Sequence, residues 1–117
     1  MPIIRRADAP TQGGYPGVER EVLVDAAQGA MSLYVGHLEI GPGSRVPTHI
    51  HPDTEEAMVI LEGSLEAILG DQLVTLGEGD TVLAPAGVKH GFLNKSGASA
   101  RLLAIFPKTQ YERVEVE

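Results

Sequence analysis

Two of the four histidines in this chain, His49 and His51, lie one residue apart in the stretch THIHPDTEEA, and three carboxylates follow within five positions. Alternate side chains of an extended strand point to the same side, so the two imidazoles project together. Imidazole nitrogen binds first-row divalent metals, and a carboxylate is a common further ligand. Pro52 ends the strand, so the chain can turn back and present Glu55 or Glu56. The stretch is therefore a candidate metal site, and the alternative is a polar loop without a metal.

Two longer segments place these residues in a fixed spacing. The first, GSRVPTHIHPDTEEAMVILEG (43–63), begins and ends with glycine and contains the histidine pair. The second, GDTVLAPAGVKHGFLN (79–94), contains His90, and fifteen residues separate the two segments. In their order and spacing the segments resemble the two-part signature of the cupin superfamily. The short separation is similar to that of small single-domain members.

This resemblance implies an all-β fold, a jelly-roll barrel of two facing antiparallel sheets. In that family three histidines and one glutamate bind a divalent metal inside the barrel, and by position these are His49, His51, Glu56 and His90. Glu56 is preferred to Glu55 because it has the six-residue spacing to Gly63. We expect one divalent transition metal ion per chain, and the ligand types suit Mn, Fe, Co, Ni, Cu or Zn.

The other positions of the two segments have structural interpretations. Glycine permits tight turns and positive φ, and we expect this role for Gly43, Gly63, Gly79 and Gly87. Pro85 is expected to set a rigid turn before His90. Asn94 is expected to hydrogen-bond to the backbone of a loop.

Three apolar residues are predicted to form a wall beside the metal. Counting alternate positions from Glu56 places Met58 and Ile60 on the metal-facing side, and counting from His90 places Phe92 there. We interpret these residues as the substrate pocket, and the alternative is ordinary core packing.

Other charged or polar residues have simpler readings. His37 lies outside both segments, and we interpret it as a surface residue or a neighbour of the ligands rather than a ligand. Tyr34, on the opposite side of the same strand, is read as a core or interface residue. Arg45 and Lys89 are candidates to hold a substrate carboxylate, but exposed charge is the preferred interpretation.

Short extended segments separated by glycine and proline must position these side chains, and this pattern predicts an all-β sandwich or barrel. Residues 1–18 contain three prolines and three glycines and are expected to form an irregular arm, leaving 19–117 as a single barrel domain. The expected strands are 19–24, 32–40, 45–51, 56–63, 64–70, 72–77, 80–85, 90–94, 100–106 and 112–116. No long helix is expected.

Composition limits the classes of partner. The length of 117 residues suits one domain. Nine basic and sixteen acidic residues give a net charge of −7, which disfavours binding to nucleic acid. Cysteine is absent, so neither a disulfide nor a thiolate metal site can form.

No apolar run reaches the ~20 residues that span a bilayer, and the first ten residues do not resemble a signal peptide. We expect a cytoplasmic protein that binds no membrane.

The predicted function is that of a metal-binding cupin that acts on or binds a small oxygen-bearing metabolite. A dioxygenase, decarboxylase, isomerase or cyclase would fit the intact ligand set, with Glu56 as a ligand that can also shuttle a proton. The alternatives are a non-catalytic binding module and a sensor domain with a structural metal. A homodimer is expected, since a barrel this small leaves a sheet face and strand edges to cover.

Overall fold

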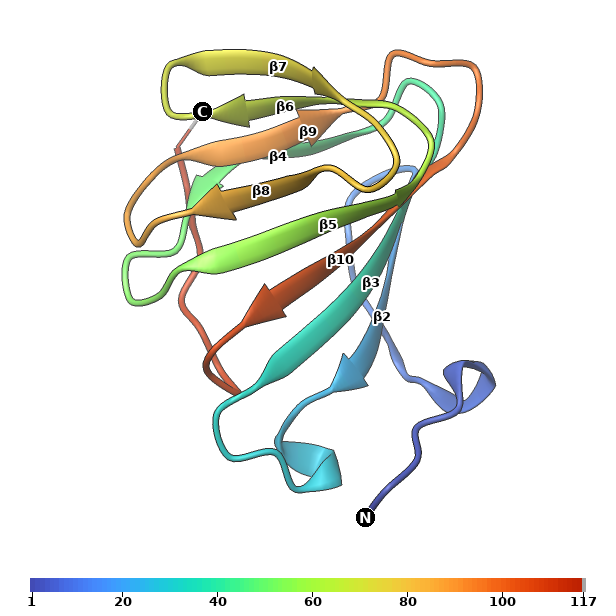
Figure 1. The fold of residues 1–117 in the computed structure, drawn as a ribbon, viewed down its shortest axis with the longest axis vertical. Coiled ribbons are helices and arrows are strands. Elements are labelled where there is room, and N and C mark those ends of the chain that lie inside the picture. Colours follow the sequence, from blue (N-terminus) through green and yellow to red (C-terminus); the bar gives the residue numbers. More distant parts are fainter. Residues whose placement is uncertain (117) are drawn as a thin grey trace.

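The computed structural model describes residues 1–116 and is built almost entirely of short strands (Figure 1). In chain order the elements are η1 (Arg6–Asp8), β1 (Thr11–Gln12), β2 (Val18–Val24), η2 (Ala26–Gln28), β3 (Tyr34–Ile40), β4 (Arg45–Ile50), β5 (Glu56–Glu62), β6 (Leu65–Leu69), β7 (Gln72–Leu76), β8 (Thr81–Ala84), β9 (His90–Leu93), β10 (Ala100–Phe106) and β11 (Val114–Glu115). Each segment expected to be extended contains a strand, whose ends differ from the prediction by no more than two residues.

The strands form two facing sheets, as Figure 1 shows. The six-stranded sheet has the order β1-β2-β3-β10-β5-β8, and the five-stranded sheet has the order β11-β4-β9-β6-β7. The strand pairs in both sheets are antiparallel. The predicted all-β architecture of two antiparallel sheets is therefore confirmed.

The amino-terminal and carboxy-terminal segments both pair with strands of this same chain. Thr11–Gln12 of the arm joins β2, and Val114–Glu115 joins β4. Two 3₁₀ turns, Arg6–Asp8 and Ala26–Gln28, are the helical elements of the described residues. No helix among residues 1–116 has the length and apolar composition needed to cross a membrane.

The core lies between the sheets and is built from alternate residues of each strand. In β10, Ala100, Leu102, Ala104 and Phe106 are buried, and the residues between them are partly exposed. This period of two is the pattern of a sheet with one face on the core. Tyr34, read as a core or interface residue, is buried in this core with 4% of its surface exposed.

The turns that the two sequence segments predicted are present. Gly43, Gly63, Gly79 and Gly87 all have positive φ, which glycine adopts without strain. At Gly63 a Cβ atom would also lie 2.9 Å from Ala100 Cα, so the β5–β6 turn packs directly on β10. These turns fix where β5 and β9 begin and end, and two of the candidate ligands are the first residues of those strands.

Candidate metal centre

Four buried side chains from three strands converge inside the barrel. His49 lies in β4 and His51 directly after it, while Glu56 and His90 open β5 and β9. His49 and His90 are cross-strand partners in the β4–β9 pair. The four residues are between 2% and 5% exposed, and one ligand atom from each lies within 4.8 Å of the others. We call them the His3Glu cluster.

Each histidine of the cluster is oriented by a backbone carbonyl. Nδ1 of His49 is 2.7 Å from the Pro47 oxygen, Nδ1 of His51 is 2.7 Å from the Glu112 oxygen, and Nδ1 of His90 is 3.0 Å from the Val88 oxygen. A carbonyl only accepts hydrogen bonds, so Nδ1 is the protonated nitrogen in all three rings. The neutral rings therefore direct the lone pair of Nε2 toward the centre of the cluster, which is the orientation that metal-binding histidines have.

Glu56 supplies the negative charge of the cluster. Its Oε1 lies 2.8 Å from His90 Nε2 and 3.3 Å from His51 Nε2. Burial alone would raise the pKa of Glu56, but the hydrogen bonds and charges of His51 and His90 hold that pKa below its ordinary value. The carboxylate is therefore ionised at neutral pH.

Burial and the nearby Glu56 carboxylate shift the pKa values of His49 and His90 in opposite directions. Burial lowers the pKa of His49 to about 4, although its bond with the Pro47 carbonyl acts in the opposite direction. Burial would also lower the pKa of His90, but the hydrogen bond to Glu56 raises it above its ordinary value. His49 is therefore neutral at pH 7, and in the metal-free cluster a proton is drawn to the His90–Glu56 pair.

This arrangement needs a cation at its centre. Three neutral rings with protonated Nδ1 would bring Nε2 lone pairs against an anionic oxygen, and a buried charge is costly without a partner. Either a proton or a metal ion relieves that repulsion. The donor set of three imidazole nitrogens and one carboxylate fits a divalent first-row metal, so the residues present fit the ion that the sequence pattern implies.

A small cavity of about 20 Å³ adjoins the cluster, and we call it the inner cavity. Its walls are mostly apolar, and besides the cluster they are formed by Arg20, Leu38, Val46, Met58, Phe92, Leu102 and Ala104. Met58 and Phe92 therefore lie where the alternation placed them. Ile60 is buried further along β5, 1% exposed, and the inner cavity is not lined by it.

The prediction from sequence did not include Arg20, Leu38, Val46, Leu102 or Ala104 in the lining, and of these only Arg20 is charged. Val18 and Val22 are buried on the inner side of β2, and Arg20 lies between them in the same alternation phase. Its Nη1 donates a hydrogen bond to the Tyr111 hydroxyl at 3.3 Å. The sequence feature that indicates its role is a positively charged residue at an inward-facing position of a strand, because inward-facing positions of a barrel are normally apolar.

Tyr111 closes one side of the cluster. Its ring stacks on Phe106 with centroids 3.8 Å apart and meets the His51 ring edge-on at 5.1 Å. Burial raises the pKa of the Tyr111 hydroxyl well above its ordinary value. The phenol is therefore a neutral group at physiological pH.

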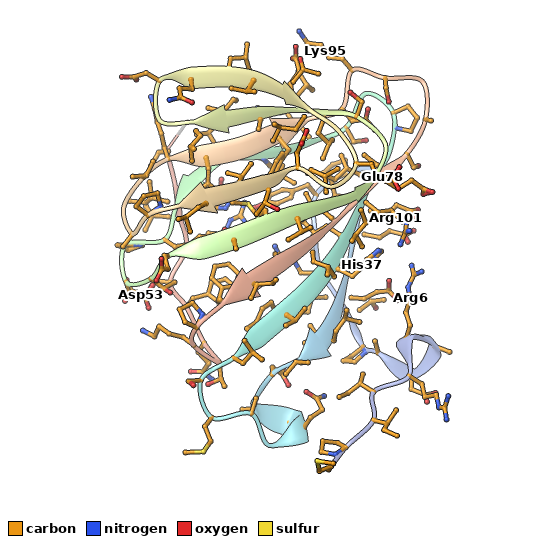
Figure 2. The ribbon with its side chains drawn as sticks, in the orientation of Figure 1. Arg6, His37, Asp53, Glu78, Lys95 and Arg101 are labelled. Atoms are coloured by element: carbon orange, nitrogen blue, oxygen red, sulfur yellow. The ribbon has the colours of Figure 1, made fainter. Side chains whose placement is uncertain are left out.

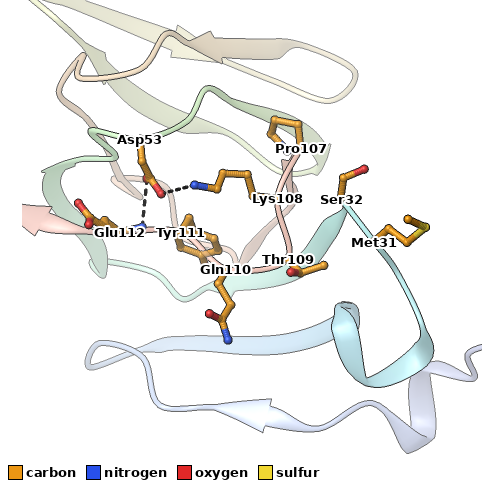
Figure 3. Close-up of a pocket in the computed structure, with 9 residues that line it drawn as sticks. All are labelled: Met31, Ser32, Asp53, Pro107, Lys108, Thr109, Gln110, Tyr111 and Glu112. Carbon is orange, nitrogen blue, oxygen red and sulfur yellow. Dashed lines mark hydrogen bonds and ion pairs between the residues drawn. The ribbon is translucent and has the colours of Figure 1, made fainter.

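The segment that contains Tyr111 is held by Asp53 at the edge of a surface groove of about 490 Å³ (Figure 3). Asp53 Oδ2 lies 2.8 Å from Lys108 Nζ, and its Oδ1 accepts a hydrogen bond from the Glu112 amide at 3.1 Å. The hydrogen bond from Lys108 lowers the pKa of Asp53. The carbonyl of Glu112 orients His51, so the segment after β10 that contains Tyr111 and Glu112 helps to hold the cluster in place.

His37 is not part of the cluster. It lies on the outer side of β3, and Figure 2 shows it on the same side of the molecule as Arg6 and Arg101. Its ring is only 3% exposed, with Nδ1 3.1 Å from Glu21 Oε1 and Nε2 3.1 Å from Arg101 Nη1. The prediction that it is not a ligand agrees with this position, but the ring is covered rather than exposed.

Arg45 and Lys89 have exposed side chains, and neither lines the inner cavity. The preferred reading of both as exposed charge is consistent with these positions.

Comparison with known proteins adds a family match, two similar protein sequences and one similar structure. The profile of the family described as Cupin domain matches residues 36–106, which contain the whole His3Glu cluster. The chain is 33% identical over 101 residues to Protein SchB of Streptomyces halstedii, covering 86% of this chain and 73% of that protein. It is 28% identical over 105 residues to the tetracenomycin polyketide synthase protein TcmJ of Streptomyces glaucescens, covering 86% and 70%. The structure of the polyketide cyclase RemF from Streptomyces resistomycificus matches with a TM-score of 0.87 and 26% identity, covering 100% of this chain and 86% of RemF.

Proposed function

Since the chain belongs to the cupin family, we propose that it is a metal-dependent enzyme that acts on a small phenolic or polycarbonyl compound, with cyclase-type chemistry. The observation that carries the proposal is the matched orientation of three histidines. All three Nδ1 atoms contact backbone carbonyls, so all three Nε2 atoms face one carboxylate inside an apolar cavity. Likeness to a polyketide cyclase over the whole chain supports the choice of reaction.

His49, His51, Glu56 and His90 would hold one divalent ion, and Mn, Fe, Co, Ni, Cu and Zn all suit these ligands. When bound, such an ion supplies Lewis acidity to a carbonyl or phenol oxygen. The apolar residues around the cluster exclude water, which strengthens electrostatic interactions in the site.

Glu56 is the residue that we assign to proton transfer. An intramolecular aldol condensation moves a proton off a carbon between two carbonyls, forms a carbon–carbon bond to a further carbonyl carbon, and releases water. It therefore requires no oxidant. Oε1 of Glu56 is the anionic oxygen of the inner cavity, and its hydrogen-bonded partner His90 can share the proton.

One observation favours a second function, a non-catalytic binding or sensor cupin with a structural metal. The inner cavity of about 20 Å³ has room for about one water molecule. A site that surrounds a reacting molecule must have room for the body of the substrate. The inner cavity is too small for this.

Metal content is the first test. The protein without a histidine tag, after incubation with Mn, Fe, Ni or Zn and removal of excess ion, is expected to retain about one equivalent by elemental analysis, because it has one complete ligand set. His51→Ala should lower the affinity by about 100-fold or more, since a ligand is lost. His37→Gln should retain the metal. Retention of metal by His51→Ala, or no metal in the wild type, would contradict the proposal.

Turnover is the second test, and it separates the two functions. Metal-loaded protein is incubated with a synthetic linear tri-β-carbonyl ester, and the loss of water with formation of an aromatic ring is followed by mass spectrometry and absorbance. Conversion by the wild type but not by His51→Ala supports the enzyme. Binding of the ester without conversion or dioxygen uptake, in every metal form, would favour the binding module.

A further inference from the structure

A second cavity, which we call the outer cavity, adjoins the inner one. It has a volume of about 210 Å³ and is lined by Gly13, Gly14, Tyr15, Val18, Arg20, Leu38 and Arg113. Arg20 and Leu38 line both cavities. The two cavities therefore share part of their walls, and the outer cavity is about ten times larger in volume than the inner one.

Arg20 lacks a counter-ion in the described part of the chain. No carboxylate of residues 1–116 forms an ion pair with it, and the hydrogen bond found for it is the one to the neutral Tyr111 hydroxyl. Arg113, the other arginine that lines the outer cavity, forms an ion pair with Glu115. A partly buried guanidinium without an anion is costly, and its planar fork matches the two oxygens of a carboxylate.

Arg113 provides a second donor at the wall of the outer cavity. Its Nε lies 2.9 Å from Glu115 Oε1, and its guanidinium carbon lies 4.8 Å from the centre of the Tyr15 ring. Its Nη2 is buried and has no hydrogen-bond partner among the described residues. Buried polar atoms of this kind are rare in native proteins and call for a partner.

We propose that the outer cavity binds the body of a small aromatic or β-keto acid, and that Arg20 anchors its anionic oxygen, with Arg113 as a second donor. This inference rests on the proposed function, because it orients the oxygen-bearing end of the molecule toward the His3Glu cluster. The volume of about 210 Å³ is below the usual range for drug-sized ligands. The substrate class is therefore a compound of about one ring rather than a large polycyclic one.

Two probes that differ mainly in charge test the anchor. Salicylate is an anion with two adjacent oxygens, and salicylamide keeps the oxygen pair but is neutral. Their affinities for zinc-loaded protein are measured by calorimetry. Arg20→Met should weaken salicylate binding by about tenfold, the loss of one charge-assisted pair. It should leave salicylamide within about twofold, since no ionic contact is lost there.

Controls separate the anchor from folding and from the metal. Arg20→Lys keeps the charge but loses the fork and should give an intermediate affinity. Arg45→Met changes an exposed arginine outside both cavities and should bind salicylate like the wild type. The zinc content and melting temperature of each variant show that the cluster and the fold are intact.

The outcomes distinguish this inference from the proposed function. Wild-type salicylate affinity in Arg20→Met, an equal loss for both probes, or no salicylate binding by the wild type would overturn the anchor. If salicylate binds metal-free wild type equally well and is lost in Arg20→Met, the anchor stands and the metal-dependent function fails.

Discussion

Among single residues, His37 offers a titration that is separate from the candidate metal centre. Arg101 donates to its Nε2, so Nδ1 carries the proton and faces Glu21, while Arg6 lies against the same carboxylate. Burial lowers the pKa of His37, the charges of Arg6 and Arg101 lower it further, and Glu21 acts in the opposite direction. The folded protein therefore favours the neutral ring.

The sign of the pH effect follows from this lowered pKa. An unfolded histidine titrates near 6.5, so below that pH the unfolded state binds more protons than the folded state. The stabilisation from neutral His37 is complete above about pH 6.5 and decreases as the pH falls toward the folded pKa. One proton accounts for at most about 1.4 kcal/mol of unfolding free energy per pH unit.

His37→Gln removes this titration and is expected to flatten the decrease in stability below pH 6.5. Urea unfolding of both proteins is measured between pH 5 and 7 with a chelator present, so that loss of metal does not contribute. The wild type should lose more stability than the variant on acidification. A difference between the two that stays constant over this range would contradict the prediction.

For single residues the sequence predicted the cluster and the neighbouring Met58 and Phe92, but not Tyr111 or Arg20. Alternation alone places His49 and His51 on one side of a strand. Glu56 and His90 were predicted from the spacing that the two segments share with the cupin signature. Tyr111 comes from the irregular segment after β10, and no periodicity shows where such a residue packs. Arg20 could have been identified by counting from Val18 and Val22, but the predicted strand, 19–24, began after Val18 and its two faces were not assigned.

Among the elements, the close approach of β4 and β9 holds the cluster in shape. Gly91 follows His90 in β9, and a Cβ atom there would lie 2.8 Å from the Val46 oxygen and 3.2 Å from Thr48 Cα. The β4–β9 register also shifts between Val46 and His49. The absence of a side chain at residue 91 therefore allows two ligand-bearing strands to approach each other.

Gly91→Ala should separate these strands beside His49 and His90. Overpacking of this kind costs about 1–3 kcal/mol of unfolding free energy. A displaced ligand should also lower metal affinity by about tenfold or more. Urea unfolding and competition with a metal indicator measure the two effects.

Gly97→Ala is the matched control. Residue 97 lies in the exposed turn before β10, its φ is not positive, and no atom lies within 4 Å of an added Cβ. The unfolding free energy of Gly97→Ala should remain within about 0.5 kcal/mol of the wild-type value. Equal effects of the two substitutions would show that the contact at Gly91 is unimportant.

Strands were the most predictable elements, because glycine and proline mark their ends and alternation marks their faces. The two shortest strands, β1 and β11, were harder to predict from the sequence. Thr11–Gln12 lies in the arm read as irregular, and β11 covers only Val114–Glu115 of the strand expected over 112–116. Two-residue strands are too short to show alternation, and partner strands far along the chain determine them.

For the whole molecule, the outer face of the six-stranded sheet is the surface that a partner would cover. Val35, Val59, Leu103 and Ile105 are apolar residues at outward-facing positions of its central strands, and Leu83 on β8 is 56% exposed. The polar outward residues His37, Glu39 and Arg101 lie on β3 and β10 of the same face. Cross-strand pairs bring the apolar residues side by side, with Leu103 opposite Val59 and Ile105 opposite Val35. Contiguous apolar surface of this kind is typical of an interface. Thr11–Gln12 of the arm and β11 pair with strands of the same chain.

We therefore predict a homodimer formed through this face, and Leu83→Glu tests it. Light scattering of the wild type at micromolar concentration should give about twice 12.4 kDa. Leu83→Glu places a charge in the apolar face and should give the single-chain mass, since an unpaired buried charge in an interface is costly. Leu73→Glu, at a 65% exposed position on β7 of the other sheet, should remain dimeric. A wild type that stays at the single-chain mass at high concentration, or dissociation by Leu73→Glu alone, would show that this face is not the interface.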